Sequence, residues 1–379
     1  MDTSAPGRPR RQTLGRVVLV VVLLYFFLAG VKALEEGIEA FGAGFTDALF
    51  EGTSNPLAAL FVGVLATVLV QSSSVTTATI VGLVGAGAIS VETAVPMVMG
   101  ANIGTTVTNT LVSLGHVRKS EEFRRAFAGA TMHDFFNVMA VIVLLPLQVA
   151  TGFLSKGAAE VAGLLRGRIE LGPAPDSPIK SAVKAPVSWV QGVLEDLGAS
   201  SEVAGIILLL TGVGLIFVCL FFITRNMRAL LAGRIERSMN AVLASGAGIA
   251  AMGVGLVITV SVQSSSITTS MLIPLIASGV LLLENAYPIT LGANLGTTVT
   301  ALLASLAATG PAALVVALSH TLFNLVGIIV FYPIRLLRQL PLRLARGLAD
   351  VAIARKRWAA VYVVGGFIVV PLVGLLLLR

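Results

Sequence analysis

The chain is poor in charge and contains almost no cysteine or histidine. Only 12% of its 379 residues are Asp, Glu, Lys or Arg, and it has one cysteine and three histidines. The single Cys219 excludes an intrachain disulfide and a cysteine-based metal cluster. The low charge, with 56% hydrophobic residues, excludes an ordinary soluble protein, in which about 25% of residues are charged.

Several features of enzymes and nucleic-acid-binding proteins are missing as well. The sequence shows no metal triad, no nucleophile with an adjacent base and no Gly-Lys-Ser/Thr phosphate loop, so we expect neither an enzyme nor a bound cofactor. The net charge of +7 comes from short basic segments between apolar runs, not from a basic helix or patch. We therefore expect no nucleic-acid partner, and the lipid bilayer as the surroundings.

What the chain does have is long uncharged runs. Residues 203–224, 359–378, 238–283 and 285–334 carry no charge, and each matches or exceeds the roughly 20 residues that cross a bilayer. A basic start followed by the apolar run 17–31 is expected to be an uncleaved first helix, since no small-residue cleavage site follows. These runs predict an all-α polytopic membrane protein.

Part of the sequence occurs twice. "VQSSSVTT" (70–77) returns as "VQSSSITT" (262–269), and "GANIGTTVT" (100–108) returns as "GANLGTTVT" (292–300), both 192 residues later. A third pair, "HDFFN" (133–137) and "HTLFN" (320–324), is offset by 187 residues. Such a register over many residues indicates an internal duplication.

The distribution of basic residues predicts opposite orientations for the two copies. The N-terminal tail and the segments 118–125, 225–237 and 335–357 are basic and are expected in the cytoplasm, whereas 32–51 has one base and five acids and is expected outside. This pattern predicts an inverted-repeat secondary transporter in the plasma (inner) membrane, multi-pass, with its N-terminus cytoplasmic.

The region around each QSSS motif is too short for two complete crossings. Residues 57–90 number 34, about 15 for each arm, which favours a re-entrant hairpin in each copy. The predicted segments are 1–51 (tail and first transmembrane helix), 52–154 (repeat 1), 155–203 (extracytoplasmic linker with some helix), 204–238 (transmembrane helix and cytoplasmic loop), 239–334 (repeat 2) and 335–379 (cytoplasmic basic loop and last transmembrane helix).

Polar side chains at membrane depth must face protein or a watery cavity. Isolated Ser and Thr usually serve helix packing, but a glutamine with three consecutive hydroxyls, repeated, favours a binding site. Hydroxyls, amides and helix N-termini can surround an oxyanion but cannot neutralise it, so cations must accompany the anion. The predicted phosphate-binding residues are Gln71, Ser72, Ser73, Ser74, Gln263, Ser264, Ser265 and Ser266.

All-oxygen ligands suit a hard cation such as sodium. Asp134 is the one acid we find inside an apolar run, and its repeat counterpart is Thr321. It is either a cation ligand or a structural group that is held protonated or paired with His133. We expect His133 and His320 to hydrogen-bond between helices, and four glycines (Gly100, Gly104, Gly292, Gly296) to permit helix breaks. The predicted sodium-binding residues are Asp134, Asn137, Asn102, Thr105, Asn294, Thr297, Thr298, Thr300 and Asn324.

At these motifs, and in "MGANIGTTVTNTLVSL" (99–114) and "EFRRAFAGATMHDFFN" (122–137), the chain resembles the type II sodium-dependent phosphate cotransporter family. The resemblance implies two hairpins in inverted repeats and inward transport of inorganic phosphate driven by sodium. It implies that the hairpin serines hold phosphate, that Asn137, Thr297 and Thr300 bind sodium, and that Asp134 accompanies a further sodium and net charge movement.

Two departures from the family pattern stand out. Animal members often have serine where this chain has Ala293, which puts one sodium-ligand hydroxyl in doubt. Their disulfide-bearing outer loop is reduced here to a linker, and their long tails are lacking, which suggests a bacterial-type member. The remaining alternatives are a sodium-coupled transporter of sulfate or arsenate, an anion channel and a membrane scaffold.

Overall fold

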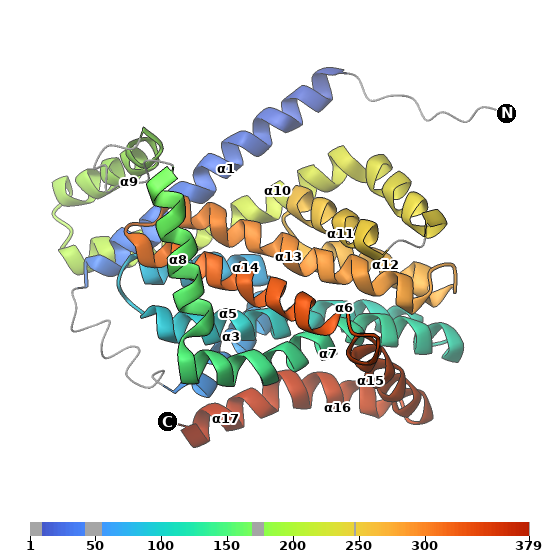
Figure 1. Cartoon of the computed structure of the whole chain (residues 1–379). Helices are drawn as coiled ribbons and strands as arrows, with labels where there is room; N and C mark the ends of the chain where they lie inside the picture. Colours follow the sequence, from blue (N-terminus) through green and yellow to red (C-terminus); the bar gives the residue numbers. More distant parts are fainter. Residues whose placement is uncertain (1–9, 42–54, 169–177, 246–247, 379) are drawn as a thin grey trace.

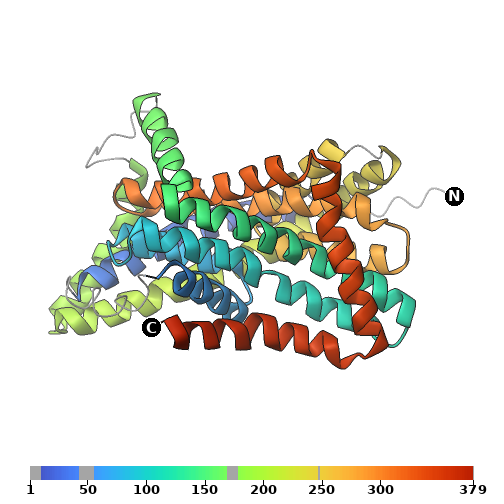
Figure 2. The ribbon, with the colours of Figure 1, turned by 60° about the horizontal axis from the view of Figure 1, so that its bottom comes forward.

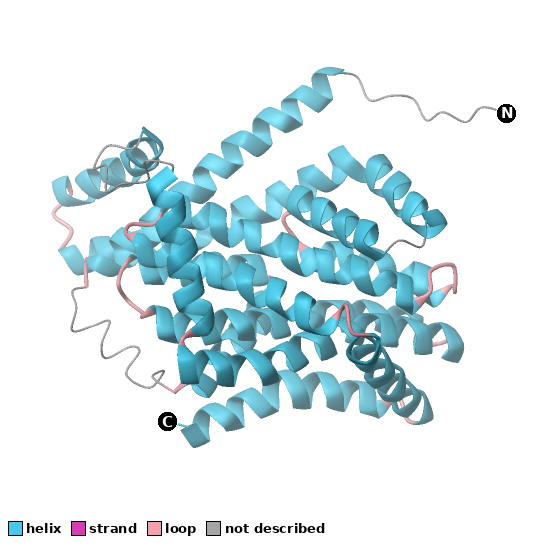
Figure 3. Cartoon of the chain, in the orientation of Figure 1, coloured by secondary structure: helices cyan, strands magenta, loops and turns pink. Residues whose placement is uncertain are grey.

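The computed structural model describes residues 10–41, 55–168, 178–245 and 248–378, and every regular element in these ranges is a helix (Figure 3). Within the described part of the chain, six helices are long and apolar enough to cross a membrane. The spans are Thr13–Glu39, Ser120–Thr151, Ser201–Met227, Leu283–Ala307, Pro311–Phe331 and Arg357–Leu378. The prediction of an all-α polytopic membrane protein is confirmed.

Four apolar helices of the described residues are shorter than a span, and a QSSS motif begins at the turn within each pair of them. They form two pairs, α3 (Pro56–Val70) with α4 (Ser73–Gly85), and α11 (Gly248–Val262) with α12 (Ser265–Ala277). Each has 13 or 15 residues, about 20 Å of helix against a hydrocarbon core of about 30 Å. Their lengths match the arms expected from the sequence, while re-entrant insertion stays a prediction.

The two pairs make equivalent contacts with the helices that follow them. α3 packs on α5 (Val91–Gly104), which continues after Thr105 as α6 (Thr106–Ser113), and α11 packs on α13 (Leu283–Ala307). α4 contacts α13 and α14 (Pro311–Phe331), and α12 contacts α6 and α7 (Ser120–Thr151). The second helix of each pair, α4 or α12, therefore packs against helices of the other copy. Figure 1 shows α12 close to α6.

The expectation that the repeated glycines break their helices is wrong for α13, which runs without interruption through Gly292 and Gly296. A Cβ on Gly292 would overlap the carbonyl of Met252, and one on Gly100 would overlap the carbonyl of Leu60. These glycines allow α11 to approach α13, and α3 to approach α5, more closely than any side chain would permit. Of the two helices with the repeated glycines, α5 is interrupted, directly after Gly104.

An aromatic core joins the two copies. The Phe136 ring on α7 lies 6.3 Å from the Tyr287 ring on α13 and 6.2 Å from Phe331 on α14, both edge to face. Phe136 and Tyr287 are 1% exposed and Phe331 is 4% exposed. Such pairs add about 0.5–1.5 kcal/mol each beyond their area burial, so they hold α7 firmly against the second copy.

The remaining helices surround this core. α1 (Arg10–Glu39) packs along α10 (Ser201–Ser245), α8 (Phe153–Arg168) packs on α14, and α9 (Pro178–Asp196) packs on α1. The basic connection expected after repeat 2 is itself a helix, α15 (Arg335–Ala354), which packs on α7. It crosses one end of the bundle and leads to α16 (Arg357–Val364), the π-helical turn Gly365–Val369 and α17 (Val370–Leu378) (Figure 2).

The polar segment expected to begin at Lys32 is helical up to Glu39. Lys32 Nζ lies 3.3 Å from Glu35 Oε2 and 3.1 Å from Glu36 Oε1. Because pairs at spacings of three and four residues neutralise these charges on the helix itself, α1 continues beyond the apolar run. Residues 42–51 of the predicted outer segment lie outside the described residues.

Candidate functional site

Each QSSS motif lies at a sharp turn between two short helices. Gln71 follows α3 and Gln263 follows α11, with φ of 57° and 58°, a left-handed conformation that costs a non-glycine residue about 1–2 kcal/mol. The side chains stabilise these turns, because Gln71 Nε2 donates to the Val68 carbonyl at 2.5 Å and Gln263 Nε2 donates to the Val260 carbonyl at 2.6 Å.

The other end of each glutamine amide is also engaged. Thr108 Oγ1 donates to Gln71 Oε1 at 3.1 Å, and Thr300 Oγ1 donates to Gln263 Oε1 at 2.8 Å. Both glutamines thus close their turns instead of presenting a free amide. Our sequence reasoning named Thr300 but missed Thr108, although the 192-residue offset relates the two.

The serines follow directly after the glutamines and begin α4 and α12. Ser72 Oγ accepts from Val75 N–H at 3.3 Å and Ser264 Oγ accepts from Ile267 N–H at 3.4 Å, so both are N-caps. Helix N-termini carry partial positive charge and unpaired N–H groups. Ser73, Ser74 and Ser265 are buried, and Ser266 is half-buried.

One hydrogen bond brings the two motifs together. Ser74 Oγ donates to the Gln263 carbonyl at 3.1 Å, although the residues are 189 positions apart. A second link lies close by, where Thr269 and Ser270 on α12 donate to Asn109 Oδ1 on α6 at 2.9 and 3.0 Å. We missed Asn109 because nothing in the sequence indicated which helix of the other copy its side chain would contact.

The predicted asparagines form two reciprocal clusters with the histidines. In the first, His133 on α7 hydrogen-bonds to Asn294 Oδ1 on α13, and Asn294 Nδ2 donates to Asn137 Oδ1 at 2.8 Å. Thr106 Oγ1 lies 2.9 Å from His133 Nδ1. His133 and Asn294 are 1% and 3% exposed, so the cluster is a buried polar network between the copies.

The second cluster repeats the first with the copies exchanged. His320 Nε2 on α14 lies 2.9 Å from Asn102 Oδ1 on α5, and Asn102 Nδ2 donates to Asn324 Oδ1 at 3.0 Å. The expectation that both histidines hydrogen-bond between helices is confirmed. The two clusters thus use the same residue types, with the histidine and the contacting asparagine exchanged between the copies.

The three predicted threonines near these clusters donate to their own helices. Thr105 donates to the Ala101 carbonyl at 3.0 Å, Thr297 to Ala293 at 3.2 Å and Thr298 to Leu295 at 2.8 Å. With the proton used in this way, a hydroxyl oxygen keeps lone pairs as acceptor sites. Through these lone pairs, the threonine hydroxyl oxygens are suited to coordinate a sodium ion.

Asp134 lies next to the C-terminal helices. Tyr362 on α16 donates its hydroxyl to Asp134 Oδ2, whereas Asp134 Oδ1 is buried without a hydrogen-bond partner among the described residues. No hydrogen bond of the described part of the chain links Asp134 to either QSSS motif. Tyr362 was missed because it lies more than 200 positions away, in an apolar run with no repeat counterpart.

A further buried acid was missed as well. Glu35 on α1 is 0% exposed, and both of its carboxylate oxygens lie 3.1 Å from the N–H of Thr309, between α13 and α14. Lys32 Nζ donates to Thr309 Oγ1 at 2.9 Å. Asp134 is therefore not the only acid inside a membrane span. Unlike Asp134, Glu35 has a hydrogen-bond partner for each carboxylate oxygen, and it links α1 to the second copy.

The chain matches the Na+/Pi-cotransporter family over residues 26–163 and 215–336. It is 35% identical to sodium-dependent phosphate transport protein 2B of Bos taurus and of Homo sapiens, in each case over 95% of this chain and 64% or 65% of the relative. It is also 35% identical to sodium-dependent phosphate transport protein 2A of Ovis aries, over 95% of this chain and 67% of the relative.

The chain thus spans about two thirds of the length of these relatives. No solved structure was found to match it. The two matched regions include both QSSS motifs, both GANxGTT motifs and both His–Asn pairs. On this evidence, the chain belongs to the Na+/Pi-cotransporter family.

Proposed function

We propose that this protein is a sodium-coupled symporter that imports inorganic phosphate across the plasma membrane by alternating access. The observation that carries the proposal is the hydrogen bond from Ser74 Oγ to the Gln263 carbonyl. It brings the first turn of α4 to the turn that precedes α12, so that hydroxyls and helix N-termini from both copies meet.

The chemistry of this meeting point suits a phosphate ion. α4 and α12 contain no Lys or Arg, so they offer hydrogen-bond donors and partial positive charge but no full charge. A doubly negative anion in such surroundings would be strongly unfavourable without counter-ions. We propose that phosphate lies between Ser73, Ser74, Ser265 and Ser266, with the glutamines shaping the turns, and that cations bind together with it.

For sodium we propose the two reciprocal clusters and the threonines beside them, which are made of amide, hydroxyl and carbonyl oxygen. Asp134, with one oxygen unpaired, is proposed as a ligand of an additional sodium. Its counterpart Thr321 donates to the Ala317 carbonyl and carries no charge. The asymmetry supports net movement of one positive charge in each cycle.

We further propose that the copies are inverted repeats, that each short helix pair is a re-entrant hairpin and that the N-terminus is cytoplasmic. The reciprocal contacts of α4 and α12, the matched turns and the distribution of basic residues support this arrangement. Inverted repeats with broken helices at the midplane are a common design of secondary transporters. The segment boundaries predicted from the sequence remain part of this proposal.

The proposal is tested by uptake of labelled phosphate into vesicles reconstituted with the full chain. An inward sodium gradient should drive accumulation, and replacement of sodium by choline should abolish it. Ser73→Ala and Ser265→Ala should each reduce uptake at low phosphate about tenfold, since a hydrogen bond to a charged group contributes about 1.5 kcal/mol or more. Ser278→Ala, at an exposed helix end, is the matched control.

Equal uptake in choline and sodium would contradict the sodium coupling. Competition by sulfate and arsenate in the same assay distinguishes phosphate from other tetrahedral oxyanions, which a set of hydroxyl donors would also fit. Counterflow exchange distinguishes a carrier from an anion channel, because only a carrier accelerates labelled uptake when unlabelled substrate is inside.

A further inference from the structure

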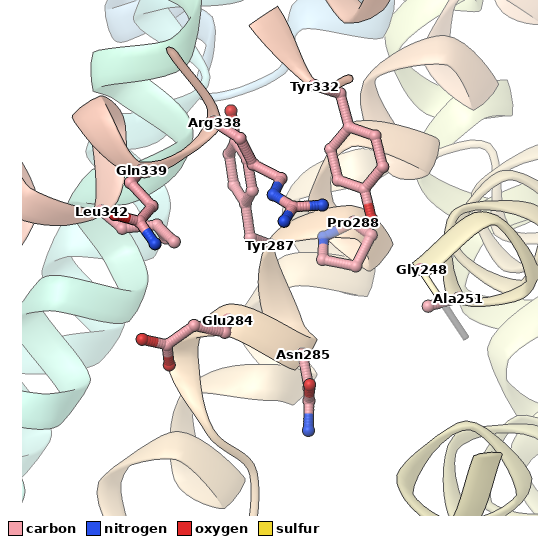
Figure 4. Close-up of a pocket in the computed structure, with 10 residues that line it drawn as sticks. All are labelled: Gly248, Ala251, Glu284, Asn285, Tyr287, Pro288, Tyr332, Arg338, Gln339 and Leu342. Atoms are coloured by element: carbon pink, nitrogen blue, oxygen red, sulfur yellow. The ribbon is translucent and has the colours of Figure 1, made fainter. Parts of the chain in front are cut away.

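A polar cavity lies at the start of α13, formed by residues that the proposed transport cycle does not use. Its volume is about 240 Å³, and it is lined by Gly248, Ala251, Glu284, Asn285, Tyr287, Pro288, Tyr332, Arg338, Gln339 and Leu342 (Figure 4). These residues come from α11, α13, the end of α14 and α15. The basic helix α15 places the cavity on the side predicted to be cytoplasmic.

Arg338 supplies an uncompensated positive charge to this cavity. Its guanidinium carbon lies 5.4 Å from the centre of the Tyr332 ring, and in Figure 4 the guanidinium is seen between the rings of Tyr332 and Tyr287. No carboxylate of the described residues pairs with it. Among the described residues, the acid that lines the cavity is Glu284, which is paired with Arg346 and so does not neutralise Arg338.

A buried hydroxyl in the same cavity also lacks a partner. Tyr287 is 1% exposed, and its hydroxyl makes no hydrogen bond to any described residue. A polar group buried in this way normally has a partner. The amides of Asn285 and Gln339 and the hydroxyl of Tyr332 line the same cavity, which makes it rich in donors around one guanidinium.

We infer that this cavity binds a phosphate group, either as inorganic phosphate or as the headgroup of an anionic phospholipid. A guanidinium that can donate two parallel N–H bonds, with neutral O–H and N–H donors around it, is the set that proteins use for phosphate. The cavity differs from the serine motifs in that it holds a fixed charge, so its ligand needs no sodium. The volume accommodates a headgroup, and the exposed side chains of Leu336 and Leu340 on α15 lie on the same helix as Arg338.

The inference rests on the proposed function only for the placement of this side in the cytoplasm, and its test is independent of transport. Labelled inorganic phosphate is added to the purified full chain in detergent with choline as the sole cation, so that no sodium is present. Arg338→Gln should weaken binding at least tenfold, and Tyr287→Phe, which keeps the ring, should weaken it about fivefold. Arg335→Gln, an exposed arginine of the same helix that does not line the cavity, should leave it unchanged.

The lipid source is tested in the same preparations. After reconstitution with phosphatidylglycerol and phosphatidylcholine in equal amounts, native mass spectrometry should show phosphatidylglycerol retained by the unchanged chain and by Arg335→Gln, and lost from Arg338→Gln. Binding of either probe that depends on Arg338 supports the site and identifies its source. If neither probe binds, or if both bind equally to Arg338→Gln, the inference is refuted, whatever the uptake assays show about sodium coupling.

Discussion

Replacing Asp134 by asparagine tests the proposed charge movement most directly. The side chain keeps its size and can still hydrogen-bond with Tyr362, but it loses the negative charge that we propose an additional sodium ion neutralises. If one net positive charge enters in each cycle, a membrane potential of 100 mV contributes about 2.3 kcal/mol to uptake. That energy corresponds to about a 45-fold increase in the phosphate gradient that the protein can sustain. With Asp134→Asn the increase should disappear, because cation and anion charges then cancel.

The assay uses vesicles with equal sodium gradients and a potassium diffusion potential set by valinomycin at zero or 100 mV, inside negative. Phosphate accumulation at steady state is compared between the two potentials for the unchanged chain and for Asp134→Asn. Glu202→Gln, an exposed acid at the start of α10, controls for loss of a carboxylate as such. A variant that transports with the voltage dependence of the unchanged chain would refute the role given to Asp134.

Three further predictions concern single substitutions. Gly292→Ala should lower the free energy of unfolding by about 1–3 kcal/mol, because its Cβ would overlap the Met252 carbonyl. Gly253→Ala, whose Cβ meets no neighbouring atom, should not lower it. Thermal unfolding in detergent measures both variants, and equal stability would contradict the close approach of α11 to α13. Glu35→Gln should lower the free energy of unfolding by about 1–3 kcal/mol in the same measurement, since it leaves Lys32 with a weaker partner. A decrease within about 0.5 kcal/mol, as for an ordinary surface residue, would show that this contact is unimportant. Ala293→Ser should lower the sodium concentration for half-maximal uptake about fivefold by adding one oxygen ligand beside Asn294; an unchanged sodium dependence would show that the missing hydroxyl is not part of a sodium site.

The local structure around the QSSS motifs could be predicted from the sequence. Long uncharged runs require helices in a bilayer, because each backbone N–H and C=O must be satisfied within the segment. The 34 residues around the first motif are too few for two crossings, and two helices of 15 and 13 residues lie there. Serine is a preferred N-cap, and Ser72 and Ser264 occupy that position.

The partners of these residues could not be predicted, because they depend on contacts far apart in the chain. Asp134 contacts Tyr362 across 228 positions, and Glu35 contacts Thr309 across 274. Glycine can break a helix or let two helices approach, and the sequence around Gly292 is compatible with both. The charges of Lys32 and Glu35 indicate a water-exposed segment in the sequence. In the structure Glu35 is buried and Lys32 half-buried, because they pair within α1 and with Thr309.

By itself, then, the sequence determined the class of protein, the duplication and the polar residues available at membrane depth, since these depend on composition, period and the cost of exposing the backbone to lipid. Only the tertiary structure decided which of those groups meet: the bond from Ser74 to Gln263, the exchange of histidine and asparagine between the copies, and the arginine cavity beside Tyr287. Local propensities act over a few residues, whereas these contacts arise from packing whole helices from two halves of the chain against each other.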